Sequence, residues 1–393
     1  MIVMELIRQA QQLMQDMVDR KLCSGMNLLV MHNGKEALYT QVGLSDIGAN
    51  KPLQRDNIFR LFSQTKPITA AAVMLLAERG VIDLRDGVEK YLPGFRDPKI
   101  IESDGTIHPA SRTPNLRDLL NMCGGLAYAD DDPSGLLVKG VFEKANEAIR
   151  AGGGIPTVEL MNMMGQQPMA AEPGTVWRYS ICADVLAAVV EVASGKRFGD
   201  FLRDEFFIPL DMKDTAFYVP EEKQDRFVKA YSCSPDGLQE WNSLHMGIGE
   251  YSREPAYQAG GAGLVSTIDD YSHFLEMMLN GGCYNGKHIL SPETVRYLTT
   301  NHLTEQEKTG LWPHMWGHGF GCLSRVCVDP AQYPGLAKEG EFGWGGMLGT
   351  DFYCFPKENF SMLVMYNTIW CCAHEAVGKL RNLLLAALSR GDL

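Results

Sequence analysis

The chain has 393 residues, of which 45% are hydrophobic, and its formal net charge at pH 7 is −12. This length suffices for two lobes, and this hydrophobic content is typical of a packed globular protein rather than a disordered one. The negative charge argues against nucleic acid or an anionic membrane as a partner, because both attract basic surfaces.

The first 21 residues predict an amphipathic helix. Its apolar face would carry Ile2, Leu6, Leu13, Met17 and Val18. Charged and amide side chains interrupt this segment too often for a signal peptide, and no run elsewhere is apolar enough to span a bilayer. Without an export signal, the ten cysteines are expected to be reduced thiols of a cytoplasmic protein.

Two short apolar stretches come next, at residues 26–31 and 37–42. Asn33-Gly34-Lys35 separates them. Asn-Gly favours a tight turn, so the pair predicts an antiparallel hairpin.

The following segment leads into an apolar helix. Residues 70–78 are rich in strong helix formers, and Gly80 is a typical stop. Ser63 would lie at the N-terminus of this buried helix, with Lys66 one turn further on the same face. Free N–H groups at such an end stabilise negative charge, and a desolvated lysine favours the neutral amine that can accept a hydroxyl proton. S-x-x-K is found in serine acyl-enzymes; the alternative is a helix cap with a surface lysine.

Residues 100–255 contain few strand patterns and many Pro and Gly breaks, which predicts a mainly helical lobe with long loops. The expected helices are Leu116–Met122, Asp184–Ala193 and Phe198–Phe207. Asp130-Asp131-Asp132 is expected to be a solvated loop.

The pattern changes again after Gly260. Thr267 is a good N-cap for a helix that would end at Leu279. Three strands and a closing helix are expected after it, at Gly319–Leu323, Gly349–Phe355, Phe360–Tyr366 and Ala373–Leu388. The chain therefore predicts a discontinuous α/β lobe, residues 1–62 and 256–393, with a mainly helical lobe inserted at residues 63–255.

Two further segments could supply chemistry beside Ser63. Tyr179 follows a Pro-Gly turn, and a tyrosine near a lysine could act as general base and acid. The alternative is a packed tyrosine, since Tyr-Ser also occurs at residues 231, 251 and 271. The glycine-rich stretch 341–350 allows close backbone approach, so one of its N–H groups could form an oxyanion hole with that of Ser63; a tight bulge is the commoner use.

A metal site is not expected from the sequence. His314 and His318 have helical spacing, but the neighbouring Pro and Gly residues argue against a helix there.

Taken together, the motifs resemble the serine β-lactamase-like superfamily, and most closely its family VIII carboxylesterases and the related fungal statin acyltransferases. The resemblance rests, in order, on Ser63-Gln64-Thr65-Lys66 and on residues 172–180, 260–267, 316–320 and 343–346. It implies the fold of class C β-lactamases and DD-peptidases, which is an antiparallel sheet flanked by helices with an inserted helical lobe.

The resemblance also implies a role for each site residue. Ser63 would be the acylated nucleophile, Lys66 its base and Tyr179 the partner that relays the proton. The backbone N–H groups of Ser63 and Met347 would hold the oxyanion. Trp344, Gly345, Gly346 and Ile181 would contact the substrate. No metal and no organic cofactor is implied.

Two departures from the superfamily bear on the substrate. The usual Tyr-x-Asn is Tyr179-Ser180-Ile181 here, and the usual Lys-Thr-Gly is Trp344-Gly345-Gly346. The cation that would hold a β-lactam or peptide carboxylate is therefore absent, and a buried carboxylate without a partner is costly. A third departure, at residues 120–126, is expected to alter packing rather than chemistry.

These departures favour a carboxylesterase that acts on small esters through a serine acyl-enzyme. A β-lactamase or DD-peptidase, an acyltransferase of the same fold, and a non-catalytic binding protein are the alternatives. The oligomeric state is left open, and a homo-oligomer would need a globular interface because no long coiled-coil pattern is present.

Overall fold

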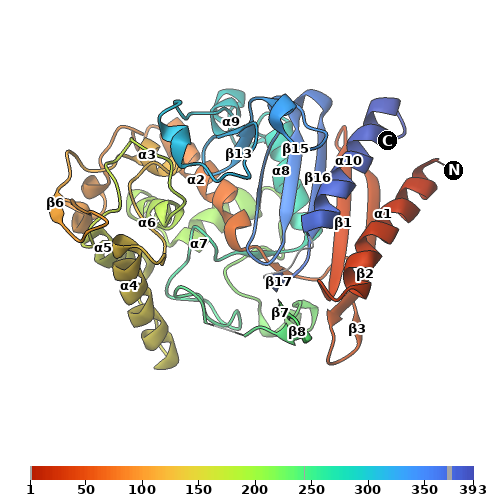
Figure 1. The fold of residues 1–393 in the computed structure, drawn as a ribbon, viewed down its shortest axis with the longest axis horizontal. Coiled ribbons are helices and arrows are strands. Elements are labelled where there is room, and N and C mark those ends of the chain that lie inside the picture. The colour runs from red at the N-terminus through yellow and green to blue at the C-terminus, as the bar shows by residue number, and fades with distance from the viewer. Residues whose placement is uncertain (1, 243, 370–373) are drawn as a thin grey trace.

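A computed structural model describes residues 2–242, 244–369 and 374–393. An eight-stranded antiparallel sheet occupies the right-hand part of the molecule as drawn in Figure 1. The strand order is β12-β13-β14-β15-β16-β1-β2-β3. These strands are β1 (Gly25–His32), β2 (Lys35–Asp46), β3 (Lys51–Pro52), β12 (His318–Phe320), β13 (Arg325–Cys327), β14 (Phe342–Gly345), β15 (Asp351–Phe355) and β16 (Phe360–Met365). The expected fold class is confirmed, and β1 beside β16 joins the two ends of the chain in one sheet.

The two faces of the sheet are covered by different helices. The terminal helices α1 (Ile2–Asp19) and α10 (His374–Arg390) lie on the outer face, at the right of Figure 1. Successive strand residues point to opposite faces, so Leu28 packs under these helices whereas Leu29 joins the core on the other face. The predicted terminal helices are therefore confirmed, although the predicted start at residue 373 lies outside the described residues.

The predicted hairpin is also confirmed. Asn33 and Gly34 have positive φ angles of 52° and 69°, which the tight turn between β1 and β2 requires. Strands β13 and β14 were not predicted. Position 343 of β14 requires glycine, because an added Cβ would lie 2.1 Å from the carbonyl oxygen of Phe352 on the neighbouring strand.

Helices fill the other side of the molecule. Those expected from the sequence are α2 (Lys66–Glu78), α3 (Leu116–Leu120), α6 (Cys182–Ser194), α7 (Phe198–Leu202, continued by a π turn at Arg203–Phe207) and α8 (Ile268–Leu279). Helices α4 (Pro133–Arg150), α5 (Thr157–Gly165) and α9 (Pro292–Leu298) were missed. Short strands complete the chain: β4 (Phe59–Arg60), β5 (Lys99–Ile101), β6 (Ile107–Pro109), β7 (Tyr231–Ser234), β8 (Gly237–Glu240), β9 (Val265–Ser266), β10 (Cys283–Tyr284), β11 (Lys287–His288) and β17 (Thr368–Ile369).

The prediction of a solvated loop at residues 130–132 is confirmed for Asp130 and Asp131, which are exposed and outside any helix or strand, but it missed the capping role of Asp132. The carboxylate of Asp132 accepts the N–H of Gly135 at 2.9 Å and caps α4. Asp130 and Asp132 both pair with Arg178, next to Tyr179. The acidic run thus starts a helix and holds the second motif in place.

One hydrophobic core runs from the inner face of the sheet into the helices. It includes Leu29 and Phe352 of the sheet, Val73 of α2 and Val185 of α6. The lobe boundaries at residues 62/63 and 255/256 stay predictions.

Every helix among the described residues is too short or too polar to cross a membrane. The eight described cysteines are free thiols, and Cys371 and Cys372 lie outside the described residues.

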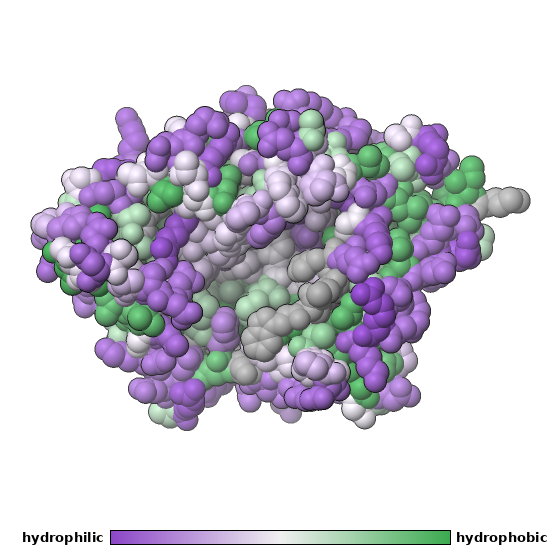
Figure 2. Space-filling view, in the orientation of Figure 1, coloured by the Kyte–Doolittle hydropathy of each residue, from purple (hydrophilic) through white to green (hydrophobic). Residues whose placement is uncertain are grey.

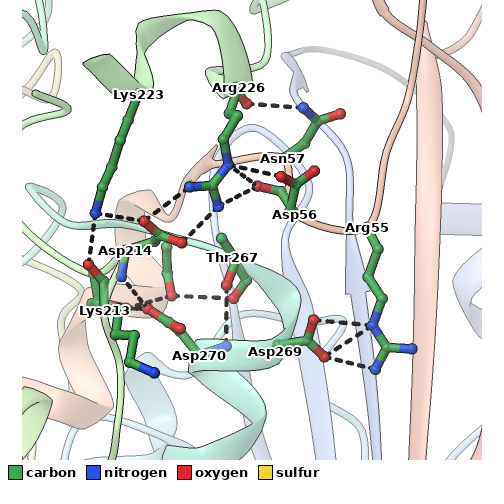
Figure 3. A network of polar contacts seen from close by, with 12 residues as sticks. Arg55, Asp56, Asn57, Lys213, Asp214, Lys223, Arg226, Thr267, Asp269 and Asp270 are labelled. Carbon is green, nitrogen blue, oxygen red and sulfur yellow. Dashed lines mark hydrogen bonds and ion pairs between the residues drawn. The ribbon is translucent and has the colours of Figure 1, made fainter. Parts of the chain in front are cut away.

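A polar network fixes the segment that leads into Ser63 (Figure 3). Arg226 pairs with Asp56 at 3.0 Å and with Asp214 at 2.6 Å, and Lys223 also pairs with Asp214, at 2.8 Å. Asp270 near the start of α8 accepts the N–H of Asp214 at 2.6 Å. Burial alone would raise the pKa of Asp214, but its ion pairs with Arg226 and Lys223 outweigh burial and lower it.

Arg226→Ala is expected to destabilise the protein by roughly 2 kcal/mol at pH 7, because it leaves the largely buried Asp214 carboxylate short of a partner. Arg55→Ala breaks a more exposed pair with Asp269 and should cost less than about 1 kcal/mol. A lowered carboxyl pKa contributes stability above the ordinary Asp range that is lost as the pH falls, so the Arg226→Ala effect should shrink towards pH 3. Urea denaturation at both pH values measures this, and equal losses for the two variants would contradict it.

Candidate active site

Ser63 lies where a strained backbone meets the start of α2. It belongs to a 3-10 turn, Phe62–Thr65, that runs directly into the helix. Phe62 has a φ of 46°, in the left-handed region that a bulky residue rarely adopts. Packing against Ala230 and Leu348 holds the Phe62 side chain. Strain of this kind persists only where surrounding packing enforces it, and it is concentrated at functional sites.

The Lys66 side chain is fully buried beside Ser63 and has three polar contacts. It is 0% exposed, and its Nζ lies 3.1 Å from the Oγ of Ser63. The same nitrogen lies 3.0 Å from the Oη of Tyr128 and 2.8 Å from the carbonyl oxygen of Gly261. The sequence placed Ser63 and Lys66 on one helix face, and the structure brings their reactive atoms together.

The partners of Lys66 suit a neutral amine as well as an ammonium. The carbonyl of Gly261 can only accept a hydrogen bond, so one N–H of Lys66 is assigned to it. The hydroxyls of Ser63 and Tyr128 can donate or accept. A neutral amine could therefore donate to Gly261 and Tyr128 and accept the proton of Ser63, which is what nucleophile activation requires.

Tyr128 is the site residue that sequence reasoning missed. It lies in the loop after α3, just past the stretch at residues 120–126 that was expected to affect packing only. Burial raises the pKa of Tyr128 well above its ordinary value, and the nearby Asp184 adds to this effect, so the phenol form is favoured. The only sequence signal for Tyr128 was its position just after residues 120–126, which depart from the motif usual in the superfamily. That signal is weak when the fold is not known.

Asp184 lies behind Lys66 and Gly261. Its Oδ1 accepts the N–H of Gly261 at 2.9 Å and the hydroxyl of Tyr257 at 2.7 Å. Burial raises the pKa of Asp184, while the charge of Lys66 acts in the opposite direction. Asp184 thus holds the Gly261 peptide that receives Lys66.

Tyr179 lies beside Lys66 but bonds a different residue. Lys66 Nζ is 4.6 Å from the centroid of the Tyr179 ring, whereas the Tyr179 Oη lies 3.3 Å from the Nε1 of Trp344. An indole N–H can only donate, so Tyr179 accepts here and its own hydroxyl proton stays available for another acceptor. Trp312 packs against both rings, at 4.8 Å from Tyr179 and 6.1 Å from Trp344.

The glycine-rich third motif touches the segment just before Ser63. A Cβ added to Gly346 would lie 2.1 Å from the carbonyl oxygen of Leu61, so only glycine allows this approach. The hydroxyl of Thr350 donates to the same carbonyl at 3.1 Å, and the N–H of Gly346 donates to the carbonyl of Thr350 at 2.6 Å. Met347 follows Gly346 and lines the same cavity as Ser63.

This cavity has a volume of about 980 Å³, and Figure 2 shows the face hollowed between the helices at left and the sheet at right. Its lining around Ser63 is mainly aromatic and apolar, with Phe62, Tyr128, Phe142, Leu244, Met246, Trp312, Met315 and Trp344. Of the predicted substrate-binding residues, Trp344, Gly345 and Gly346 line it. Ile181 does not, because it is buried in the core at the start of α6.

Comparison with known proteins gives the family context of this site. A family model described as Beta-lactamase matches residues 10–368. Protein Rv1367c of Mycobacterium tuberculosis is 32% identical over 90% of this chain and 88% of its own length, and Esterase EstB of Burkholderia gladioli is 30% identical over 91% and 88%. A solved structure titled "EstCE1, a hydrolase with promiscuous acyltransferase activity" superposes with a TM-score of 0.79 at 25% identity, covering 97% of this chain and 99% of that one.

Gly346→Ala is expected to lower the free energy of unfolding by about 1–3 kcal/mol, because its Cβ would overlap the Leu61 carbonyl. Gly345→Ala is the matched control, since its Cβ would lie no closer than 3.2 Å to any neighbour. Urea denaturation of both variants measures the difference. Equal losses would mean that the close approach to Leu61 is not a constraint.

Proposed function

This chain belongs to the beta-lactamase family of serine hydrolases and acyltransferases, and we propose that it is a carboxylesterase that works through an acyl-enzyme on Ser63. The observation that carries the proposal is the 3.1 Å contact between Lys66 Nζ and Ser63 Oγ. A lysine with no solvent exposure, in contact with a serine at the wall of a large apolar cavity, suits a general base paired with a nucleophile.

In the proposed first step, Lys66 accepts the proton of Ser63 as the Oγ of Ser63 attacks the ester carbonyl. Tyr128 and Gly261 hold the amine in position through the other two contacts. The backbone N–H groups of Ser63 and Met347 stabilise the oxyanion. Close contact of Gly346 with Leu61 supports this assignment because it brings the two backbone segments together.

In the second step, the alkoxide leaves and needs a proton. The hydroxyl of Tyr179 supplies it, because its oxygen already accepts from Trp344 and its proton remains free to donate. The ammonium of Lys66 then returns a proton to the Tyr179 phenolate, which leaves the amine neutral again. Water attacks the acyl-enzyme and gives its proton to this amine, and Lys66 passes the proton to the Ser63 Oγ as the acid is released.

A neutral ester is the substrate class that fits the cavity best. The third motif presents the indole of Trp344, whose ring packs against Trp312 and Phe320. No cation replaces the lysine of the usual third motif at that position, so a substrate carboxylate would lose its usual partner there. The aromatic wall favours an apolar acyl or alcohol group.

Acyl transfer is a second candidate reaction, and the promiscuous acyltransferase activity of EstCE1 favours it. An alcohol would then replace water in the second step. Mixing a short-chain ester with increasing methanol distinguishes the two: a transfer enzyme forms methyl ester faster than free acid.

Ser63→Ala should fold normally and release no p-nitrophenol from p-nitrophenyl acetate, because the nucleophile is gone. Intact mass after brief exposure of the unmodified protein should show one added acetyl group, and peptide mapping should place it on Ser63. Ser111→Ala, an exposed serine, is the control. Activity that survives in Ser63→Ala, or an adduct elsewhere, would refute the nucleophile assignment.

Tyr179→Phe should slow hydrolysis of ethyl esters by about 10²-fold or more, yet slow p-nitrophenyl esters far less, because p-nitrophenolate leaves without a proton. Tyr128→Phe should slow both classes to a similar degree, since it loosens the base rather than the acid. Steady-state kcat/KM values for both esters test this. If Tyr128→Phe, rather than Tyr179→Phe, slowed ethyl esters much more than p-nitrophenyl esters, Tyr128 would be the proton donor and the two roles would be reversed.

A further inference from the structure

A second cluster of reactive side chains lies at the edge of the sheet, and one of its members, His318, also lines the cavity. His318 begins β12, Cys327 ends β13, and Glu341 immediately precedes β14. His318 and Cys327 are directly opposite each other in the β12–β13 pair, and the N–H of Cys327 donates to the carbonyl of Glu341 at 2.8 Å. The register of the sheet thus brings one ligand atom of each side chain within 4.8 Å of the other two.

The ring of His318 is held in an orientation that leaves one nitrogen without a partner. Its Nδ1 lies 2.7 Å from the carbonyl oxygen of Trp316, which can only accept, so Nδ1 carries a proton. Its Nε2 is buried, has no hydrogen-bond partner, and lies 3.7 Å from the Oε1 of Glu341. A lone pair on Nε2 would face a carboxylate oxygen, an unfavourable contact that either a proton on Nε2 or a cation bound between the two groups would relieve.

The carboxylate of Glu341 is fixed from behind. Its Oε1 accepts from the Nη2 of Arg381 on α10, and its Oε2 accepts the N–H of Lys338 at 2.9 Å. Each carboxylate oxygen keeps a second lone pair, so these bonds orient the group without using all its capacity. Metal ligands are commonly held this way, with histidine bound to a backbone carbonyl and carboxylates bound by outer donors.

The charges around the cluster cancel before any cation binds. Arg381 opposes Glu341, and Arg325 opposes Asp351 at 3.2 Å, so two arginines face two carboxylates. The thiol of Cys327 would lose its proton to solvent on binding and so add a third negative charge.

From this geometry we propose that His318, Cys327 and Glu341 form a zinc site separate from Ser63. Tetrahedral zinc bonds of about 2.0 Å to nitrogen and oxygen and about 2.3 Å to sulfur place the ligand atoms roughly 3.3–3.6 Å apart. The observed 3.7 Å between Nε2 and Oε1 is close to that spacing, and every pair of ligand atoms lies within 4.8 Å, so small side-chain movements on binding would complete the tetrahedron. Calcium and magnesium prefer oxygen ligands only, whereas nitrogen, sulfur and oxygen together favour zinc.

Zinc at this position would support the edge of the sheet. It would join β12, β13 and the start of β14, and Glu341 would still hold α10 through Arg381. Phe320 on β12 packs at 5.2 Å against Trp344, so the same strand backs the cavity wall. The proposal does not depend on the hydrolase assignment.

The test is zinc binding by the full chain after treatment with a chelator and dialysis. Elemental analysis after equilibration in a zinc buffer should give one zinc per chain, with a higher melting temperature than the metal-free protein. His318→Ala and Cys327→Ala should lose this zinc and its stabilisation. His314→Ala and Cys283→Ala are the matched controls and should retain both. If His318→Ala does not fold, His318→Gln keeps the size and polarity of the side chain.

Cobalt substitution gives a second readout that does not depend on stability. Cobalt bound at this site should show a thiolate-to-metal charge-transfer band in the near ultraviolet that disappears in Cys327→Ala. The proposal fails if the unmodified protein binds no stoichiometric zinc. It also fails if binding and the cobalt band persist unchanged in both His318→Ala and Cys327→Ala.

Discussion

The burial of Lys66 is the constraint on which the rest of the site depends. A fully buried amine must find its hydrogen-bond partners within the protein, because leaving it alone would cost several kcal/mol. Those partners come from its own helix turn, from the loop after α3 and from the backbone at residue 261. Meeting this one requirement therefore positions Ser63, Tyr128 and the Asp184-bound peptide of Gly261 relative to one another.

Aromatic side chains, rather than charged ones, surround the Tyr179 hydroxyl beside Ser63 and Lys66. Trp344 occupies the third-motif position at which the resemblance to β-lactamases and DD-peptidases would lead one to expect a lysine, and its N–H donates to Tyr179. Trp312 closes the group by packing against both rings. The third-motif departure at Trp344 thus forms, with Tyr179 and Trp312, an aromatic wall beside Ser63.

The sequence predicted the β1–β2 hairpin, the buried helix after Ser63 and the cap at Thr267 because each depends on local signals, whereas the antiparallel sheet followed from the family resemblance. It missed α4, although Asp132 and Pro133 are good start signals, because the acidic run was interpreted as solvated. It also missed Tyr128, since the contact with Lys66 joins residues that only the fold brings together. Ile181 was placed by analogy with a motif, and its burial at the start of α6 could not be inferred from position alone.

The pairing of β1 with β16 has a consequence for the order of folding. Leu28 lies opposite Val364, so the sheet joins segments from opposite ends of the chain. During synthesis the β1 edge of the β1–β2 hairpin stays unpaired until β16, near the end of the chain, has been made. Such distant pairing is slow because a long loop must close before the contact is gained. The nucleophile segment therefore has its finished surroundings only at the last stage of folding.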